Sequence, residues 1–407
     1  MIKKKGENMS RYLVKLKPID SFFFGGEKVF DFYDGKKPLK NNIVKSREFP
    51  QQTSILGMIR KEILVLNSCI KEKWDYSKEQ QKENDRLIGE RSFNIADENQ
   101  DFGIINSVSP VFIIEETKGS DKFLIKIPKD HNVNNSHDKY IPFKFNDDKG
   151  NCLKVKTNLA EEVYLPIDFE AKKGLSEDFM DIKTGEIVSK NKIFIKDCSI
   201  GIKLGENHKT ENNSLFRLEK YKFNYDSNYE RADKFFAFIL DIEEEEGKIT
   251  FENYKNIVAL GGEGSHFFIS FEKINFDIKD KIDFINKAKN DFTIKERISV
   301  TTNKEEIKEI KRVYKIILLS DTYISKDIYE KNCNYSISTK IDFRSLRSEN
   351  YNILKDKNYY KRFERSESRY SFIEKGSVLF ATKDNYNTLI KNISNSKFQK
   401  IGYNIFI

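Results

Sequence analysis

The segment Phe49–Arg60 constrains the fold of this chain most, because it marks a change from strand to helix. The stretch Phe22–Glu27 ends an earlier predicted strand in two glycines, so a turn is expected there. Thr53 and Ser54 are good N-cap residues for the helix, and Arg60 lies off its apolar face. That apolar face is predicted from residues at helical spacing, namely Ile55, Ile59, Ile63 and Leu66.

The segment Lys36–Arg47, between the glycine pair and the helix, is expected to be a basic loop. It contains no acidic residue, and its cations are Lys36, Lys37, Lys40, Lys45 and Arg47. A helix N-terminus offers N–H groups and positive potential to phosphate, so a basic loop beside it favours a polyanion. The alternative is an ordinary surface loop that enters a packed helix.

Length and composition restrict the class of protein. The chain has 407 residues, enough for two or three domains, and its net charge of +8 permits a polyanion partner without requiring one. The four cysteines are far apart, which argues against a disulfide framework and a zinc site. No apolar run approaches the ~20 residues of a membrane span, and no apolar region follows the basic start Met1–Gly6. We therefore expect a cytoplasmic protein with no membrane partner.

Alternating and continuous apolar patterns predict several strands but no βαβ rhythm. The predicted strands are Tyr12–Lys17 with Tyr12, Val14 and Leu16 on one face, Phe102–Ile114, Phe235–Leu240, Phe267–Phe271, Val378–Thr382 and a last strand with Tyr403, Ile405 and Ile407. A short helix is expected over Asn387–Ile393. Strands and helices in this irregular order indicate an α+β fold with antiparallel sheets.

Four polar stretches interrupt these strands. Lys71–Arg91 is predicted to be an exposed helix or a mobile loop, and Lys118–Lys192 an insertion of short strands and long loops. Glu243–Glu246 is expected to be an exposed turn. Asn350–Tyr370 mixes cations with tyrosines and either stacks bases or forms a solvated helical face.

The sequence carries none of the common catalytic motifs. It has neither a phosphate-binding loop of the Gly-x-x-x-x-Gly-Lys type nor a His-Glu-x-x-His motif, and its four histidines fit no common zinc site. In Gly261–Ser265, Glu263 stands alone, whereas a palm-domain cyclase or polymerase needs paired carboxylates to hold metal ions. This segment is either a loop that approaches RNA or a tight hairpin turn. We expect a structural or RNA-facing role for His266 rather than that of a general base.

Five segments, in order, resemble one family. They are Leu16–Phe30, Phe49–Arg60, Ala259–Ser265, Lys375–Phe380 and Lys400–Phe406. Together they resemble the third subunits of the type III-B CRISPR Cmr effector complex, within the RAMP superfamily. The resemblance covers both ends of the chain and one central motif, and the stretch from about Glu115 to Glu246 is unmatched.

The resemblance implies two ferredoxin-like (RRM-like) domains with antiparallel sheets. The first would span residues 10–298 with a large insertion at about 115–246, and the second residues 299–407. It implies a non-catalytic subunit with no cofactor and no metal, which binds the 5′ handle of the guide RNA. Its expected protein partners are the large palm-domain subunit and a neighbouring RAMP backbone subunit, and the insertion is expected to carry part of that contact.

The expected RNA-binding residues combine the basic segment, the helix start and two glycine loops. They are Gly25, Gly26, Lys45, Arg47, Gln51, Gln52, Thr53, Ser54, Arg60, Gly261, Gly262, Glu263, His266, Lys400 and Gly402, and Lys397 is expected to add charge beside Gly402. Two alternatives stay open. A repeat-processing RNA endonuclease of the same superfamily needs a positioned base, commonly histidine, yet the first 130 residues contain none. A protein scaffold that contacts no RNA is the other.

Overall fold

The computed structural model describes most of the chain as two compact units. The described residues are 8–30, 42–70, 77–117, 121–133, 138–149, 151–156, 162–204, 210–225, 232–244, 250–277, 292–301, 304–344, 346–347, 364–365 and 369–407. Unit 1 comprises Met1–Glu90, Asp101–Asp121 and Lys190–Asn275. Unit 2 comprises Arg91–Gln100, Lys122–Ser189 and Phe276–Ile407.

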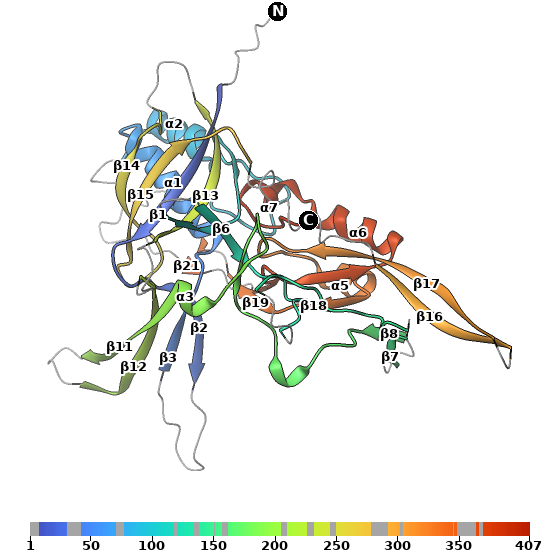
Figure 1. Ribbon diagram of the computed structural model, residues 1–407. Helices are drawn as coiled ribbons and strands as arrows, with labels where there is room; N and C mark the ends of the chain where they lie inside the picture. Colours follow the sequence, from blue (N-terminus) through green and yellow to red (C-terminus); the bar gives the residue numbers. More distant parts are fainter. Residues whose placement is uncertain are drawn as a thin grey trace, which may run out of the picture. The chain divides into compact units, whose positions relative to one another are not determined.

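Unit 1 contains two sheets, which we call the central sheet and the basic sheet (Figure 1). The central sheet has the order β5 (Phe112–Glu116), β13 (Asp233–Glu244), β1 (Asn8–Pro18), β15 (His266–Lys273) and β14 (Lys255–Ala259), with β4 (Ile105–Val108) also paired to β13. The basic sheet has the order β11 (Phe194–Leu204), β12 (Thr210–Phe223), β3 (Asn42–Arg47) and β2 (Phe24–Phe30). The β12–β3 pair is parallel. The helices of unit 1 are α1 (Gln52–Leu66), α2 (Lys78–Ile88) and α3 (Lys190–Ile193).

Period-2 alternation on β1 and β15 gives the central sheet one buried face. Tyr12, Val14 and Leu16 are each 0% exposed, as the sequence predicted. Helices α1 and α2 lie on one face of this sheet (Figure 1). Buried Glu62 of α1 accepts hydrogen bonds from Tyr254 Oη at 2.9 Å and Asn256 Nδ2 at 2.8 Å, which hold α1 against β14. Burial and the Glu62 carboxylate raise the pKa of Tyr254 to about 12.

An aromatic cluster forms the shared core of the two sheets of unit 1. The Phe236 ring of β13 lies 4.9 Å from Phe223 of β12, 5.1 Å from Phe22 and 5.6 Å from Phe24 of β2. Phe267 of β15 stacks on Phe24 with ring centroids 5.9 Å apart. Large rings bury much apolar area, so this cluster fixes where the basic sheet leaves the central sheet.

Unit 2 is assembled from several small sheets. Its elements are β6 (Asp121–Lys126), β7 (Leu153–Lys156), β8 (Glu162–Leu165), η1 (Ala171–Lys173), β9 (Phe179–Asp181), β10 (Ile187–Val188), β16 (Phe292–Thr301), β17 (Lys304–Ile317), α5 (Lys326–Asn332), β18 (Tyr335–Ile337), β19 (Lys340–Phe343), β20 (Leu346–Arg347), β21 (Glu364–Arg365), β22 (Tyr370–Ile373), β23 (Val378–Ala381), α6 (Lys383–Ile393) and α7 (Ser396–Lys400). One sheet has the order β16-β17-β23-β18, and α6 buries Leu389 and Ile393 in a core with Leu379 of β23.

Several predicted elements are confirmed, and others need correction. Phe235–Leu240, Phe267–Phe271 and Val378–Ala381 are strands, and α6 includes the expected helix. The stretch 102–114 instead contains two strands, β4 and β5, because Ser109–Pro110 interrupts the pairing. Glu243 and Glu244 continue β13 rather than forming a turn, since Glu244 accepts hydrogen bonds from Ser10 and Tyr12.

The predicted last strand is confirmed only in part. Ile405 and Ile407 form antiparallel backbone hydrogen bonds with Leu319 and Ile317, and Phe406 bridges Leu318. Tyr403 precedes this pairing and is buried in the core of unit 2. In the polar stretch Lys71–Arg91, the predicted exposed helix is confirmed by α2, which buries only Leu87. Residues 71–76 and most of Asn350–Tyr370 lie outside the described residues, so their interpretation stays a prediction.

The chain is therefore a mixed α+β protein with mainly antiparallel sheets and few helices. The two ferredoxin-like domains and the boundary at 298/299 stay predictions. No helix in the described part of the chain is long and apolar enough to cross a membrane.

Candidate nucleic-acid interface

Two glycine motifs that are far apart in sequence meet in unit 1. The Gly262 N–H donates to the Phe23 carbonyl at 2.9 Å, and the Phe23 N–H donates to Ser265 Oγ at 2.9 Å. A Cβ at Gly261 would lie 2.3 Å from the Phe23 oxygen, so only glycine allows this approach. The Gly261–Ser265 turn and the start of β2 therefore form one structure.

Gly261–Ser265 is a tight turn between β14 and β15. Gly261, Glu263 and Gly264 have positive φ values of 90°, 55° and 67°. The ring of exposed His266 donates from Nδ1 to the Gly264 carbonyl at 2.6 Å, since a carbonyl only accepts. The hairpin geometry is confirmed, and contact of this turn with RNA stays a prediction.

The glycine pair Gly25–Gly26 lies within β2, not in a turn after a strand. The β2–β3 register shifts between Gly25 and Lys28, which marks a bulge. A Cβ at Gly26 would lie 2.0 Å from the Lys45 carbonyl, whereas one at Gly25 would meet nothing within 4 Å. Gly26 therefore needs glycine for the close approach of β2 to β3, and Gly25 does not.

Lys45 and Arg47 lie on strand β3, which corrects the predicted basic loop over this stretch. They pair with β2 on one side, and β3 pairs with β12 on the other. Lys45 is exposed and makes no hydrogen bond or ion pair through its side chain within the part of the chain that the structure describes. The remaining cations of the predicted loop, Lys36, Lys37 and Lys40, lie outside the described residues.

Helix α1 begins two to three residues earlier than the sequence predicted. Gln51 is the N-cap, its side chain makes no capping hydrogen bond, and Thr53 and Ser54 lie in the first turn. The Ser54 and Ile55 N–H groups both donate to the Gln51 carbonyl, at 2.9 and 3.1 Å. Buried Gln52 donates from Nε2 to the Ser109 carbonyl at 2.8 Å, which draws the helix start inward. Its side-chain amide is therefore already used within unit 1.

The Arg60 side chain contacts residues of unit 1. Its Nη2 lies 3.5 Å from the Asp101 carbonyl, and its guanidinium lies 5.8 Å from the centre of the Phe102 ring. Burial lowers the pKa of Arg60 to about 10. Its expected contact with RNA stays a prediction, and these contacts would compete with it.

The C-terminal candidates belong to unit 2. Lys400 ends α7 and is exposed, while Gly402 has φ 85° and is buried. Lys397, expected to offer charge, is only 7% exposed, because its ammonium donates to the carbonyls of Asn94, Ile95 and Asp97. That contribution of Lys397 was predicted wrongly: the lysine fastens the segment 94–97 to α7.

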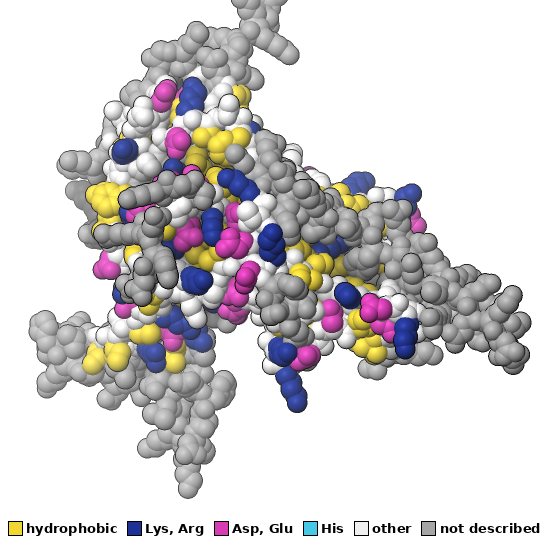
Figure 2. Space-filling model, in the orientation of Figure 1, with side chains coloured by type: hydrophobic (Ala, Val, Ile, Leu, Met, Phe, Trp, Pro, Cys, Tyr) yellow, Lys and Arg dark blue, Asp and Glu magenta, His cyan; other side chains and the backbone are white. Residues whose placement is uncertain are grey.

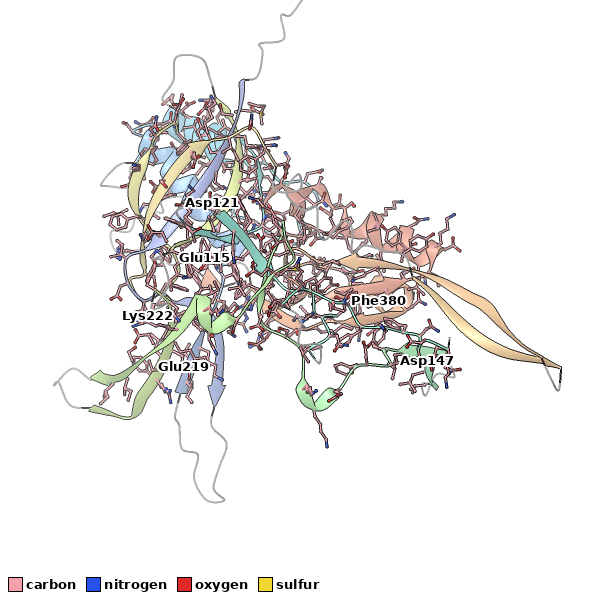
Figure 3. The ribbon with its side chains drawn as sticks, viewed as in Figure 1. Glu115, Asp121, Asp147, Glu219, Lys222 and Phe380 are labelled. Carbon is pink, nitrogen blue, oxygen red and sulfur yellow. The ribbon has the colours of Figure 1, made fainter. Side chains whose placement is uncertain are left out.

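Sequence reasoning missed four cations of the basic sheet: Lys196 on β11 and Arg217, Lys220 and Lys222 on β12. Lys45 lies opposite Glu219 of β12, so these cations share one sheet with it. Figure 2 shows Lys and Arg side chains gathered over β3, β11 and β12, and Figure 3 shows Glu219 and Lys222 on β12. The alternation within β12 was visible in the sequence, but its pairing with distant β3 was not.

Within the described residues, no group of three or more His, Cys, Asp or Glu side chains is placed to hold a metal ion. None of the four cysteines, all within the described residues, forms a disulfide. The interface available to a ligand therefore consists of cations, exposed glycine backbone and an exposed imidazole.

Comparison with known proteins places the chain among the CRISPR-associated proteins. The sequence model described as "CRISPR-associated protein (Cas_Cmr3)" matches residues 14–407, and the chain belongs to this family. It is thus a subunit of a type III-B CRISPR effector.

Solved structures with a similar chain include two of the type III-B Cmr-beta complex. One is bound to cognate target RNA and AMPPnP, and its chain is 14% identical with a TM-score of 0.44. The other is bound to cognate target RNA, and its chain is 15% identical with a TM-score of 0.44. In both cases the match covers 98% of this chain and 96% of the other. A search of curated proteins gives no match.

Proposed function

We propose that this chain is a non-catalytic effector subunit that binds the repeat-derived 5′ handle of the guide RNA. It docks on the large palm-domain subunit and contacts a neighbouring backbone subunit, in antiviral defence. The observation that carries RNA binding is the junction in unit 1 where the Gly261–Ser265 turn joins β2 beside Lys45. Family membership supports the place in the complex.

The junction has the properties of a backbone-reading site. Gly25, Gly261 and Gly264 are exposed, so main-chain N–H groups can approach a phosphate closely without side-chain obstruction. Lys45 supplies a cation that no described protein group neutralises. Such a site recognises the shape and charge of RNA, and base pairing by the guide then reads sequence.

The test is the salt dependence of guide-RNA binding by the full chain. Replacing Lys45 and Arg47 by alanine is expected to weaken binding and reduce the slope of log K against log salt by about 0.7 for each lost contact with a single strand. The matched control is Lys383→Ala with Lys391→Ala, two exposed lysines of α6. An unchanged slope in the Lys45 variant would remove β3 from the site.

The non-catalytic assignment has its own test. The chain alone is expected to leave a repeat-containing transcript intact with and without Mg²⁺. Cleavage that His266→Ala abolishes would contradict this and favour the endonuclease alternative.

For docking, the open face of the central sheet is the best-supported surface. Ile257 and Phe268 lie directly opposite each other on β14 and β15 and are 53% and 52% exposed. Lys17 lies opposite Phe268 and already forms an ion pair with Asp233 at 2.6 Å. The two apolar side chains are thus bordered by a paired charge, and protein interfaces likewise have an apolar centre with a polar rim. Phe268→Ala with Ile257→Ala is expected to reduce copurification of the large subunit and leave RNA binding intact. Loss of RNA binding instead would assign this face to RNA.

The insertion is a poorer place to test docking than its sequence indicated. Asp130 and Tyr140 are buried in unit 2, where Tyr140 donates to Asp130 at 2.7 Å and Lys315 contacts both. Deleting residues 130–150 would therefore leave the Lys315 ammonium buried and unpaired. Loss of assembly in that deletion would reflect damage to unit 2 as much as loss of a contact.

A further inference from the structure

The register of the basic sheet places three cations on one of its faces. Glu219 of β12 lies opposite Cys198 of β11 and Lys45 of β3. Arg217, two residues earlier, and Lys196, two residues before Cys198, point to the same face because side chains alternate along a strand. We call the surface formed by Lys45, Lys196, Cys198, Arg217 and Glu219 the Lys45 face.

The Lys45 face carries an excess of positive charge. Its one carboxylate, Glu219, lies 3.8 Å from the Arg217 guanidinium, which also donates to Cys198 Sγ at 3.3 Å. Lys45 and Lys196 make no ion pair or side-chain hydrogen bond within the described residues. Adjacent strands are about 4.8 Å apart and alternate residues about 6.6 Å apart, so the three cations can follow a short run of phosphates.

The same face is open to solvent. The Arg217 side chain is 52% exposed, Ile200 beside it is 73% exposed, and Lys196 and Cys198 are exposed. Unpaired lysines retain their hydration and counterions, and a polyanion that displaces the counterions gains binding free energy. A neutral protein surface would have to bury the lysines without compensation, which disfavours it as the occupant.

We propose that the Lys45 face binds the sugar-phosphate backbone of the guide RNA, so that the RNA surface continues from β3 across β12 to β11. This inference rests on the proposed function and extends it to Lys196 and Arg217, within the region that sequence reasoning gave to protein contacts. The RNA segment lies over β12, with its phosphates near these two cations and Lys45.

The test compares two double variants of the same hairpin in the full chain. Lys196→Ala with Arg217→Ala removes two charges from the Lys45 face, and Lys220→Ala with Lys222→Ala removes two from the opposite face of β12. With fluorescently labelled guide RNA, the first variant is expected to reduce the salt slope by about 1.4, two single-strand contacts. The second is expected to change the slope by much less.

The outcomes separate this inference from the proposed function. If only the Lys45–Arg47 variant flattens the slope, handle binding stands and the extension over β11 and β12 is wrong. If no variant changes the slope, both are wrong. Equal effects of the two hairpin variants would show general attraction by net charge and overturn the assignment to one face. Competition by polyglutamate as strong as that by RNA would make an acidic protein the occupant.

Cys198 provides a readout that needs no substitution. Its thiol is exposed on the Lys45 face, whereas burial raises the pKa of the Cys333 thiol in unit 2 to about 11, so Cys333 is expected to react slowly. Guide RNA is expected to slow alkylation of Cys198 by N-ethylmaleimide, measured by mass spectrometry, with half-buried Cys69 and Cys152 as internal references. Unchanged alkylation of Cys198 at saturating RNA would overturn the inference.

Discussion

Strand β1 of the central sheet differs from the basic sheet in how its surface cations are paired. On β1 of the central sheet, each outward cation has an acidic partner: Arg11 with Asp241 at 2.6 Å, Lys15 with Glu116 at 2.7 Å and Lys17 with Asp233 at 2.6 Å. On the basic sheet, Lys45, Lys196, Lys220 and Lys222 have no ion-pair partner within the described residues. The net charge of +8 is therefore less informative than which cations are already paired.

Strand order explains the difference. Strand β1 lies between β13 and β15, and the register places Asp241 directly opposite Arg11 and Glu272 diagonally to Lys15. On the basic sheet, Glu219 of β12 lies 3.8 Å from Arg217, and Asp197 of β11 lies opposite Lys220 but forms no ion pair with it. Arg11 and Lys17 are held in close ion pairs at 2.6 Å, so a phosphate would have to displace an acidic partner to bind them. Arg217 lies 3.8 Å from Glu219 and is 52% exposed, so this weak pair leaves it able to contact a phosphate.

The largest expected effect comes from a substitution in the aromatic core that the two sheets of unit 1 share. Phe236→Ala removes the ring that contacts Phe22, Phe24 and Phe223, and is expected to lower the free energy of unfolding by about 3–5 kcal/mol. Urea unfolding followed by circular dichroism measures the loss. The control is Phe268→Ala, on the exposed face of β15 in the same central sheet, which should change stability little. Equal effects would show that the shared aromatic core is not what joins the sheets.

An intermediate effect is expected from adjacent glycines of β2. Gly26→Ala forces a Cβ against the Lys45 carbonyl and is expected to lower stability by about 1–3 kcal/mol, while Gly25→Ala has open space. Because Gly26 sets the approach of β2 to Lys45, its variant should also weaken RNA binding at a protein concentration and temperature where it remains folded. Similar stability of the two variants would contradict the close approach.

The smallest effect is expected on the central sheet. Lys17→Ala breaks the pair with Asp233 and should lower stability by no more than about 1 kcal/mol. Its salt slope for guide RNA should match that of the unaltered chain, unlike that of the Lys45 variant. A reduced slope would mean that a cation held in a close ion pair also contacts RNA, and close pairing would then not separate the cations of β1 from those of the basic sheet.

Local patterns in the sequence predicted much of unit 1. The alternation of Tyr12, Val14 and Leu16 and the glycines of the 261–265 turn gave the correct elements. Pairing between distant segments was not predictable in this way: Lys45 was placed in a loop because nothing local indicates that Asn42–Arg47 inserts between β2 and β12.

Tertiary contacts also overrode local signals at the helix start and at Lys397. Thr53 and Ser54 have better capping side chains than Gln51, yet the bond from Gln52 to Ser109 moves the start of α1 earlier. From the sequence, Lys397 was expected to be a surface charge. In the structure its ammonium donates to three carbonyls of residues 94–97, a segment remote in sequence.

The central claim is that unit 1 holds the handle of the guide RNA at the junction of β2, β3 and the Gly261–Ser265 turn. The most direct measurement is photo-crosslinking of the assembled complex with guide RNA carrying 4-thiouridine in the repeat-derived 5′ segment, followed by mass spectrometry of the adducts. We predict adducts in peptides that contain Gly25–Lys45 or Gly261–His266. Adducts confined to unit 2, for example at Lys400–Phe406, with none in these two peptides, would contradict the account.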